Sequence, residues 1–225
     1  MNNTTNAMLQ VFNNIGVLQT AVPSDVFNNL KNAVENLPRD SKLINNYLLG
    51  HIKEEYSLNH IKDNMSDTVL SVANAWCNSH PGYIETFEEA AKSKNYELYL
   101  DTLWVNKQKK YEFNPMHHHA GILSFVIWVK IPYDLREEEA YFPPVAGETE
   151  ENRICCYTSK FSFYYVDTLG RLQQQAISVD KGYEGTMIMF PSSLHHGVYP
   201  FYTSDDYRIS VSGNIRLRVS DDKNL

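Results

Sequence analysis

The sequence predicts a mainly β fold, a jelly roll or antiparallel sandwich, with helices confined to its N-terminal part (an α+β arrangement). Two observations support this prediction. Apolar residues recur at helical spacing over the first third of the chain, and from Tyr96 onward they recur at a period of two, which is typical of strands. Short strand-like segments then follow one another without helices between them, as in sandwiches and jelly rolls.

The helical third contains four candidate segments. Ser24 or Asp25 can cap a helix that runs to about Leu37 and stops before Pro38. The spacing of apolar residues predicts three further helical segments, over residues 43–56, 66–79 and 83–91.

The rest of the chain reads as strands and turns. Residues 96–106 show the strand period, and residues 122–131 are rich in β-branched and aromatic residues, as a buried strand is. Residues 133–153 are acidic and contain two adjacent prolines, so we expect a long loop that acts as a lid or recognition element. Further strands are predicted at residues 161–166, 175–179, 186–190, 197–199 and 207–219.

The chain of 225 residues is expected to form one compact domain, with a helical part at 1–95 packed on a β core at 96–225.

Its 20 basic and 27 acidic residues give a net charge of −7, which argues against nucleic-acid binding through a basic surface. The N-terminus lacks the pattern of a secretory signal, and the longest apolar stretch is too short to cross a bilayer. We therefore expect a soluble, cytoplasmic protein with reduced cysteines and no membrane partner, and the oligomeric state stays open.

Histidines are the most informative residues. Five of the eight fall in two groups, at 117–119 and 195–196. Imidazole is the commonest side-chain ligand for divalent transition metals. Because residues two apart on a strand share a face, His117 and His119 can converge on one ion while the residue between them faces away. The third ligand must come from a distant segment, and His196 opens a predicted strand at a return distance that suits a jelly roll.

A possible anion site follows the second histidine group. Arg208 and Ser210 share one face of the last predicted strand. A guanidinium and a hydroxyl on neighbouring inward positions can clamp a carboxylate. Asn106 precedes the histidine segment, where its amide can bind the same ligand or cap a turn.

These segments resemble the iron(II)- and 2-oxoglutarate-dependent oxygenases, most closely the phage-type, prolyl-hydroxylase-like branch. A weaker likeness covers residues 48–56. The main blocks are LWVN (103–106), EFNPMHHHAG (112–121), SFVIWVKIP (124–132), FPSSLHHGV (190–198) and RISVSGN (208–214).

The resemblance implies a double-stranded β-helix, a cupin-like jelly roll open at one end, with the metal between its two sheets. It implies that His117, His119 and His196 bind iron. It also implies that Arg208 and Ser210 hold the far carboxylate of 2-oxoglutarate, and we expect Asn106 to contribute to cosubstrate binding.

One position departs from the wider superfamily, in which the second ligand is usually Asp or Glu. His119 stands at that position here. If the register differs by one residue, His118 or Glu112 is the alternative second ligand. Three neutral imidazoles leave the ferrous charge uncompensated, which strengthens the Coulomb attraction for a dianionic cosubstrate.

The implied activity is a dioxygenase that uses Fe(II), O2 and 2-oxoglutarate, with ascorbate as an assay additive. It would hydroxylate a C–H bond of a peptidyl, prolyl-type or small-molecule substrate and release succinate and CO2. If the chain is phage-encoded, it would act in the host-cell cytoplasm. Two alternatives stay open, a cupin-like three-histidine enzyme that does not use 2-oxoglutarate and a non-enzymatic jelly-roll binding module. The clamp at residues 208–210 favours the oxygenase over the first, and the complete histidine set argues against the second.

Overall fold

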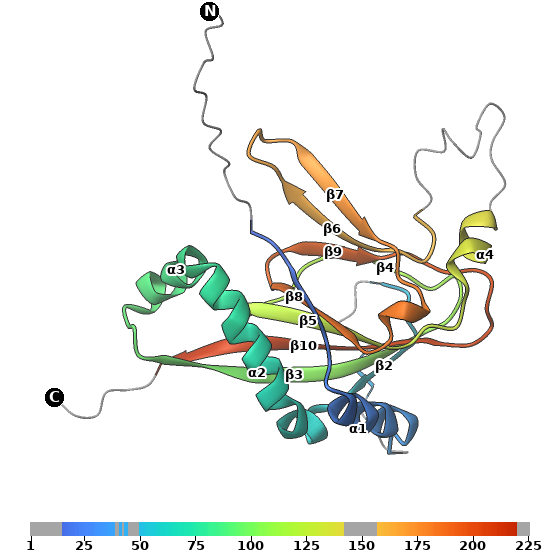
Figure 1. Cartoon of the computed structure of the whole chain (residues 1–225), viewed down its shortest axis with the longest axis horizontal. Helices are drawn as coiled ribbons and strands as arrows, with labels where there is room; N and C mark the ends of the chain where they lie inside the picture. The colour runs from blue at the N-terminus through green and yellow to red at the C-terminus, as the bar shows by residue number, and fades with distance from the viewer. Residues whose placement is uncertain (1–14, 39–40, 42, 45–49, 142–156, 220–225) are drawn as a thin grey trace, which may run out of the picture.

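Two antiparallel β-sheets face each other, and helices cover the outer face of the larger sheet (Figure 1). The structure is a computed structural model that describes residues 15–38, 41, 43–44, 50–141 and 157–219. The arrangement confirms the predicted mainly β jelly roll with N-terminal helices. None of the helices in these ranges is both long and apolar enough to cross a membrane.

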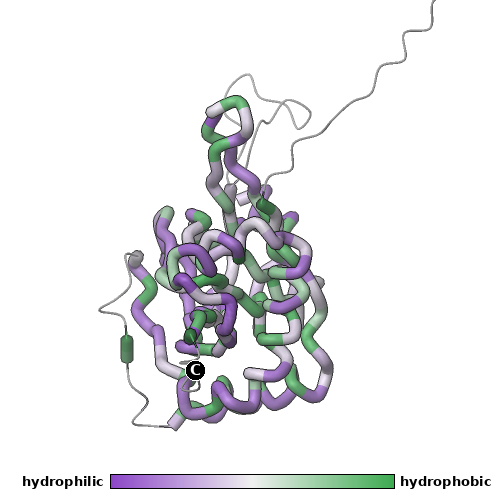
Figure 2. The backbone as a smooth tube through the Cα atoms, turned by 90° about the vertical axis from the view of Figure 1, so that its left-hand side faces the viewer, coloured by the Kyte–Doolittle hydropathy of each residue, from purple (hydrophilic) through white to green (hydrophobic). Residues whose placement is uncertain are grey.

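The larger sheet has six strands in the order β1-β8-β5-β10-β3-β2, and the smaller has four in the order β4-β9-β6-β7. The hairpin of β6 and β7 projects from the body of the molecule (Figures 1 and 2). The strands of the larger sheet are β1 (Leu18–Ala21), β2 (Glu54–Ser57), β3 (Tyr96–Gln108), β5 (Leu123–Lys130), β8 (Thr186–Pro191) and β10 (Arg208–Val219). Those of the smaller sheet are β4 (Asn114–His117), β6 (Phe161–Val166), β7 (Leu172–Ile177) and β9 (His195–Val198).

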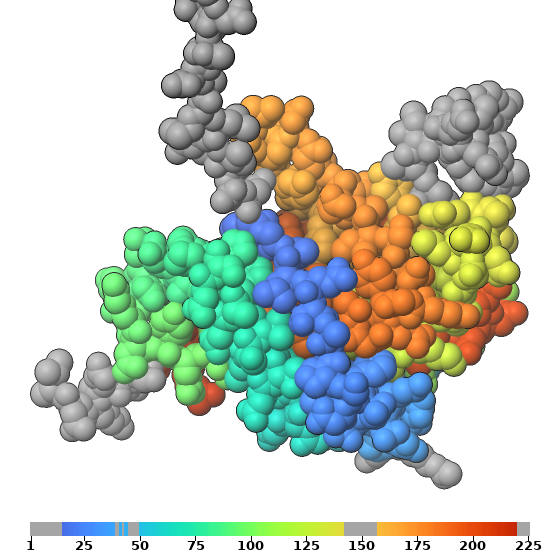
Figure 3. All heavy atoms as spheres, viewed as in Figure 1, coloured from blue at the N-terminus to red at the C-terminus, as the bar shows by residue number. Residues whose placement is uncertain are grey.

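Helices pack on the larger sheet, and the segment that carries β1 and α1 crosses the face of the molecule seen in Figure 3. Of these helices, α2 packs directly on β3. The helices are α1 (Ser24–Glu35), α2 (Lys62–Ser79) and α3 (Pro81–Ala91), followed later by the short α4 (Leu135–Ala140) and accompanied by the 3₁₀ turns η2 (Asn59–Ile61) and η3 (Lys181–Tyr183).

Strand β5 explains why its sequence is apolar at almost every position. Alternate side chains of a strand point to opposite faces of the sheet. Phe125, Ile127 and Val129 join the core under the helices, whereas Val126 and Trp128 join the core between the two sheets. Both faces of β5 are therefore covered, and the strand anchors the smaller sheet to the helical layer.

Helix α4 is fastened to the loop before β10 by one buried carboxylate. Glu138 is 0% exposed. Its oxygens accept hydrogen bonds from the backbone N–H groups of Tyr202 and Thr203 and from the Thr203 hydroxyl. Such a buried carboxylate is stable only because donors surround it.

Most predicted elements are confirmed, with shifted ends. The strands at 161–166, 186–190 and 207–219 agree with β6, β8 and β10 to within one residue. The strand predicted at 175–179 begins earlier, and α2 begins at Lys62 instead of Ser66. Strands β1 and β4 are short and were not predicted.

Two helix predictions are wrong in part. No helix covers 43–56 within the described residues, since Glu54–Ser57 is a strand that pairs with β3. Pairing along a free sheet edge satisfies the backbone there and overrides the helical spacing. Helix α1 starts at Ser24 with Pro23 at the N-cap position, and no side chain caps it. The proposed Ser24 or Asp25 cap is therefore absent.

The predicted loop at 133–153 is only partly irregular. Residues 135–140 form α4, which begins where the Asp134 side chain accepts a hydrogen bond from the Arg136 N–H. Residues 142–156, with Cys155 and Cys156, lie outside the described residues. Cys77 is a free, buried thiol, as expected. The division at residue 95 stays a prediction, although β1 and β2 from the first part join the larger sheet.

Candidate metal centre

The structure brings the three predicted histidines together. His117 ends β4, His119 follows two residues later, and His196 is the second residue of β9. Strands β4 and β9 pair so that His117 and His196 are direct partners. Ring centroids lie 4.3 Å apart for 117–196, 5.0 Å for 117–119 and 5.1 Å for 119–196. One ring nitrogen from each histidine lies within 4.8 Å of the other two.

Backbone carbonyls fix the orientation of two of these rings. The His117 Nδ1 lies 2.7 Å from the Pro115 oxygen, and the His196 Nδ1 lies 3.0 Å from the Leu194 oxygen. A carbonyl can only accept, so Nδ1 carries the proton and Nε2 keeps its lone pair. The His119 backbone N–H donates a hydrogen bond to the Ser192 backbone oxygen over 2.9 Å, and the His119 ring makes an edge contact with the Trp104 ring.

Burial keeps the three imidazoles neutral. Desolvation lowers the pKa of His119 to about 4 and lowers the pKa of His117 and, more strongly, of His196. Repulsion between neighbouring imidazolium charges lowers the pKa of each ring further. Three neutral imidazoles with ring nitrogens within 4.8 Å of one another are a donor set for a divalent transition metal, so the residues fit the iron that the resemblance implies.

The alternative second ligands do not belong to the triad. The His118 ring is exposed and contacts the His195 ring at 4.9 Å. The Glu112 carboxylate accepts a hydrogen bond from the Lys109 N–H over 2.9 Å. Neither belongs to the group of metal-capable residues that the described part of the chain contains.

Arg208 lies in the wall of the same cavity and is 3% exposed. Its five N–H groups all have protein acceptors, at 2.6–3.2 Å. These acceptors are neutral: the Gln108 side-chain oxygen, the Tyr133 hydroxyl and the backbone oxygens of Ser159 and Tyr199. No carboxylate of the described residues is within ion-pair distance of it. A buried cation without a counter-ion attracts an anion strongly.

Ser210 and Asn106 form a polar row on the cavity side of the larger sheet. Ser210 of β10 pairs with Asn106 of β3, and Asn106 pairs with Glu55 of β2. With its amide oriented to suit its neighbours, Asn106 donates to Glu55 Oε2 over 2.6 Å and accepts from Trp104 Nε1 over 3.2 Å. The cavity is lined by all four of these side chains, those of Ser210, Asn106, Glu55 and Trp104.

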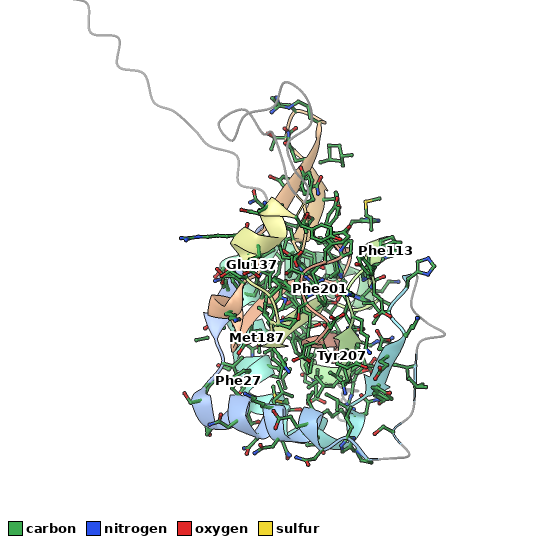
Figure 4. The ribbon with its side chains drawn as sticks, turned by 90° about the vertical axis from the view of Figure 1, so that its right-hand side faces the viewer. Phe27, Phe113, Glu137, Met187, Phe201 and Tyr207 are labelled. Carbon is green, nitrogen blue, oxygen red and sulfur yellow. The ribbon has the colours of Figure 1, made fainter. Side chains whose placement is uncertain are left out.

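The cavity has a volume of about 320 Å³, enough for a small ligand, and lies between the two sheets. Figure 4 shows the side chains of the molecule, with the buried Phe201 in its interior. The histidine triad forms part of the cavity wall, while Arg208, Ser210 and Asn106 lie on β10 and β3 of the larger sheet.

The sequence did not single out Gln108, Asn114 and Glu55, which line the cavity, or Tyr133, which contacts Arg208. Gln108 lies two residues beyond Asn106 on the same strand, so the period of two could have placed it on the cavity face. The other three residues reach the site only because segments that are distant in the sequence come together in the fold.

A jelly roll whose cavity holds three histidines and an arginine without a counter-ion fits the class of metal-dependent oxygenases that the sequence resembles. The pattern of the family described as "Putative 2OG-Fe(II) oxygenase" matches residues 102–214, half of the chain. The chain therefore belongs to the 2OG-Fe(II) oxygenase family, where 2OG is 2-oxoglutarate.

Two solved structures share the fold at low sequence identity. A prolyl-4-hydroxylase of Pseudomonas putida is 13% identical, with a TM-score of 0.51 over 89% of this chain and 92% of the other. A 2OG-Fe(II) oxygenase family oxidoreductase of Burkholderia pseudomallei is also 13% identical, with a TM-score of 0.50 over 90% and 84%. No curated protein sequence matches the chain.

Proposed function

We propose that the protein is an iron(II)- and 2-oxoglutarate-dependent dioxygenase that hydroxylates a C–H bond of a peptidyl, prolyl-type or other small substrate. The observation that carries the proposal is one cavity that combines three neutral histidines with a buried arginine lacking a counter-ion. Family membership and the fold shared with a prolyl-4-hydroxylase support it.

In this proposal His117, His119 and His196 hold the iron through their ring nitrogens. The bound iron and 2-oxoglutarate would supply the oxidative chemistry, in which one oxygen atom of O2 enters succinate and the other enters the product hydroxyl, with release of CO2. The carbonyl partners of His117 and His196 keep Nδ1 protonated, which directs the Nε2 lone pairs inward.

Arg208 and Ser210 bind the far carboxylate of 2-oxoglutarate in the proposal. The cosubstrate exchanges some of the neutral acceptors around Arg208 for a carboxylate, which forms stronger, charge-assisted hydrogen bonds. The Tyr133 hydroxyl, 3.0 Å from Arg208 Nη1, is placed to take part in that exchange. Asn106 stays a predicted cosubstrate contact, because it neighbours Ser210 and lines the same cavity.

The test is succinate formation from 2-oxoglutarate with ferrous iron, O2 and ascorbate, measured with the wild-type protein and with Arg208→Ala. We expect slow turnover without an added substrate and its loss in the variant. Unchanged turnover in Arg208→Ala would remove the proposed cosubstrate site.

One observation favours a second candidate, a three-histidine metalloenzyme that does not use 2-oxoglutarate. All five donors of Arg208 are already engaged, so Arg208 can serve the fold alone. Iron binding without any 2-oxoglutarate binding in the wild-type protein would support this candidate instead.

A further inference from the structure

The cavity wall contains a carboxylate that the proposed chemistry does not use. Glu55 on β2 is 4% exposed and lines the same cavity as the histidine triad. It ends the row of cross-strand neighbours that begins at Ser210 and passes through Asn106. Since neighbouring strands are about 4.8 Å apart, Glu55 lies roughly 10 Å from Ser210, at the far side of the cavity floor.

The carboxylate is held in place by its neighbour. Asn106 donates to one oxygen of Glu55, and Trp104 in turn holds the Asn106 amide. The adjacent Glu54 faces the other side of the strand, where it accepts hydrogen bonds from the hydroxyls of Tyr56 and Tyr207. The two glutamates therefore have different environments, and only Glu55 faces the cavity.

A second acceptor borders the cavity close to the metal centre. Asn114 is 8% exposed, and its Oδ1 has no hydrogen-bond partner among the described residues, while its Nδ2 lies 3.3 Å from His117 Nε2. A buried carbonyl oxygen without a donor is costly unless a ligand supplies one.

The segments that carry these two acceptors are tied together. The His51 N–H donates to the Phe113 oxygen over 2.9 Å, just before β2 and β4 begin. Packing there is so close that a Cβ atom on Gly50 would lie 2.7 Å from Asn114 Oδ1. The segments that lead into β2 and β4 therefore lie side by side, and both Glu55 and Asn114 line the cavity.

We propose that Glu55 and Asn114 form a subsite for a positively charged nitrogen of the substrate, an ammonium or guanidinium group. This inference rests on the proposed oxygenase function and narrows its substrate class. A cation offers several N–H donors and a charge that matches the carboxylate, and the Trp104 ring in the same wall can contact it through its π face.

The charge distribution of the cavity supports this assignment. Arg208 carries positive charge toward one side, where the cosubstrate carboxylate would bind, and Glu55 offers an acid at another. Burial raises the pKa of Glu55 to about 8, and a bound cation lowers it again by Coulomb attraction. The affinity for a cation should therefore increase with pH between about 6.5 and 8.5.

The subsite discriminates between candidate substrates. The nitrogen of a prolyl residue within a peptide is a tertiary amide with neither charge nor N–H, so it cannot use these acceptors. Free amino acids of the prolyl type, other small amines and basic side chains can use them.

The experiment compares N-butylguanidinium with N-butylurea, which has the same shape but no charge. Binding is measured by calorimetry to the iron(II)-loaded protein with an unreactive 2-oxoglutarate analogue, without O2. We expect the wild type to prefer the cation by about tenfold or more, as a charge-assisted pair predicts. The preference should survive in the control Glu54→Gln and disappear in Glu55→Gln.

Equal affinities in the wild type, no binding of the cation, or a preference that survives in Glu55→Gln would overturn the proposal. If Glu55→Gln does not fold, the pH dependence of binding to the wild type is the test. The affinity for N-butylguanidinium must then rise with pH, while the affinity for N-butylurea stays constant. An affinity for N-butylguanidinium that does not change with pH overturns the proposal. Failure of the oxygenase function would appear separately, as loss of iron or analogue binding in the wild type.

Discussion

His117 and His196 are direct partners across the β4–β9 pair, with ring centroids 4.3 Å apart. The pairing register of these two short strands therefore sets the geometry of the candidate metal centre. A slip by one residue would turn one imidazole to the opposite face of the sheet.

Replacing His196 with alanine is expected to abolish stoichiometric iron binding, because only two ring nitrogens of the triad remain. The adjacent His195→Ala is the matched control, since that exposed ring contacts His118 outside the triad. Bound iron is measured by metal analysis after gel filtration. Tight stoichiometric binding in His196→Ala would show that the ligand assignment is wrong.

Arg208→Lys is expected to raise the KM for 2-oxoglutarate about tenfold or more. Lysine keeps the charge but loses the planar fork that binds a carboxylate through two parallel hydrogen bonds. Arg216→Lys on the same strand is the control, because Arg216 is half exposed and pairs with Asp101. The thermal midpoint of each variant is measured alongside. A well-folded Arg208→Lys with an unchanged KM contradicts the clamp.

The metal-free protein is expected to lose stability as the pH falls from about 6.5 to 4. The pKa of each triad histidine is lower in the folded chain than its unfolded value of 6.5, so the unfolded chain binds more protons in this window. The free energy of unfolding then falls by up to about 1.4 kcal/mol per pH unit for each imidazole that stays neutral. Urea titrations at several pH values measure this slope.

The variant His119→Gln should show a smaller slope than the wild type in the same titrations. Identical slopes in the two proteins would show that the triad does not carry the pH dependence.

Glu55 should produce the opposite trend at higher pH. Its pKa is about 8 in the folded chain and 4.5 in the unfolded chain, so the folded state holds the extra proton between these values. The free energy of unfolding therefore falls as the pH rises through this window. In urea titrations at several pH values, the stability of the wild type relative to Glu55→Gln should fall from pH 5 to pH 8.

Glu138→Ala is expected to destabilise the fold by about 2–4 kcal/mol. The change removes, at a partly buried site, the shared acceptor of two backbone N–H groups and a hydroxyl. The exposed neighbour Glu137 (Figure 4) provides the control, and Glu137→Ala should change stability by less than about 0.5 kcal/mol. Urea denaturation measures both variants.

Strand alternation correctly places Arg208 and Ser210 on one face of β10, and both line the cavity. His117 and His119 also line the cavity, but β4 ends at His117, so strand alternation does not explain why these two rings converge. That His196 returns to the same place is a property of the jelly roll, which the resemblance implied.

What the sequence did not reveal depends on tertiary contacts. A helix is predicted over residues 43–56, yet Glu54–Ser57 pairs with the free edge of β3 and forms a strand. Glu55 therefore reaches the cavity through an element that sequence analysis assigned to the wrong class. Asn114 and Tyr133 lie beside distant partners, and single residues of these types carry no pattern that predicts such contacts.

The order of strands in the larger sheet has a consequence for folding during synthesis. Strand β10 lies between β3 and β5, although both precede it by many residues in the chain. During synthesis on the ribosome, β3 and β5 must therefore wait, each with an unpaired edge, until the strand carrying Arg208 emerges. We expect the final closure of this gap to be a late, highly cooperative step of folding, so that a nascent chain has the histidines well before it has a cavity in which they can act.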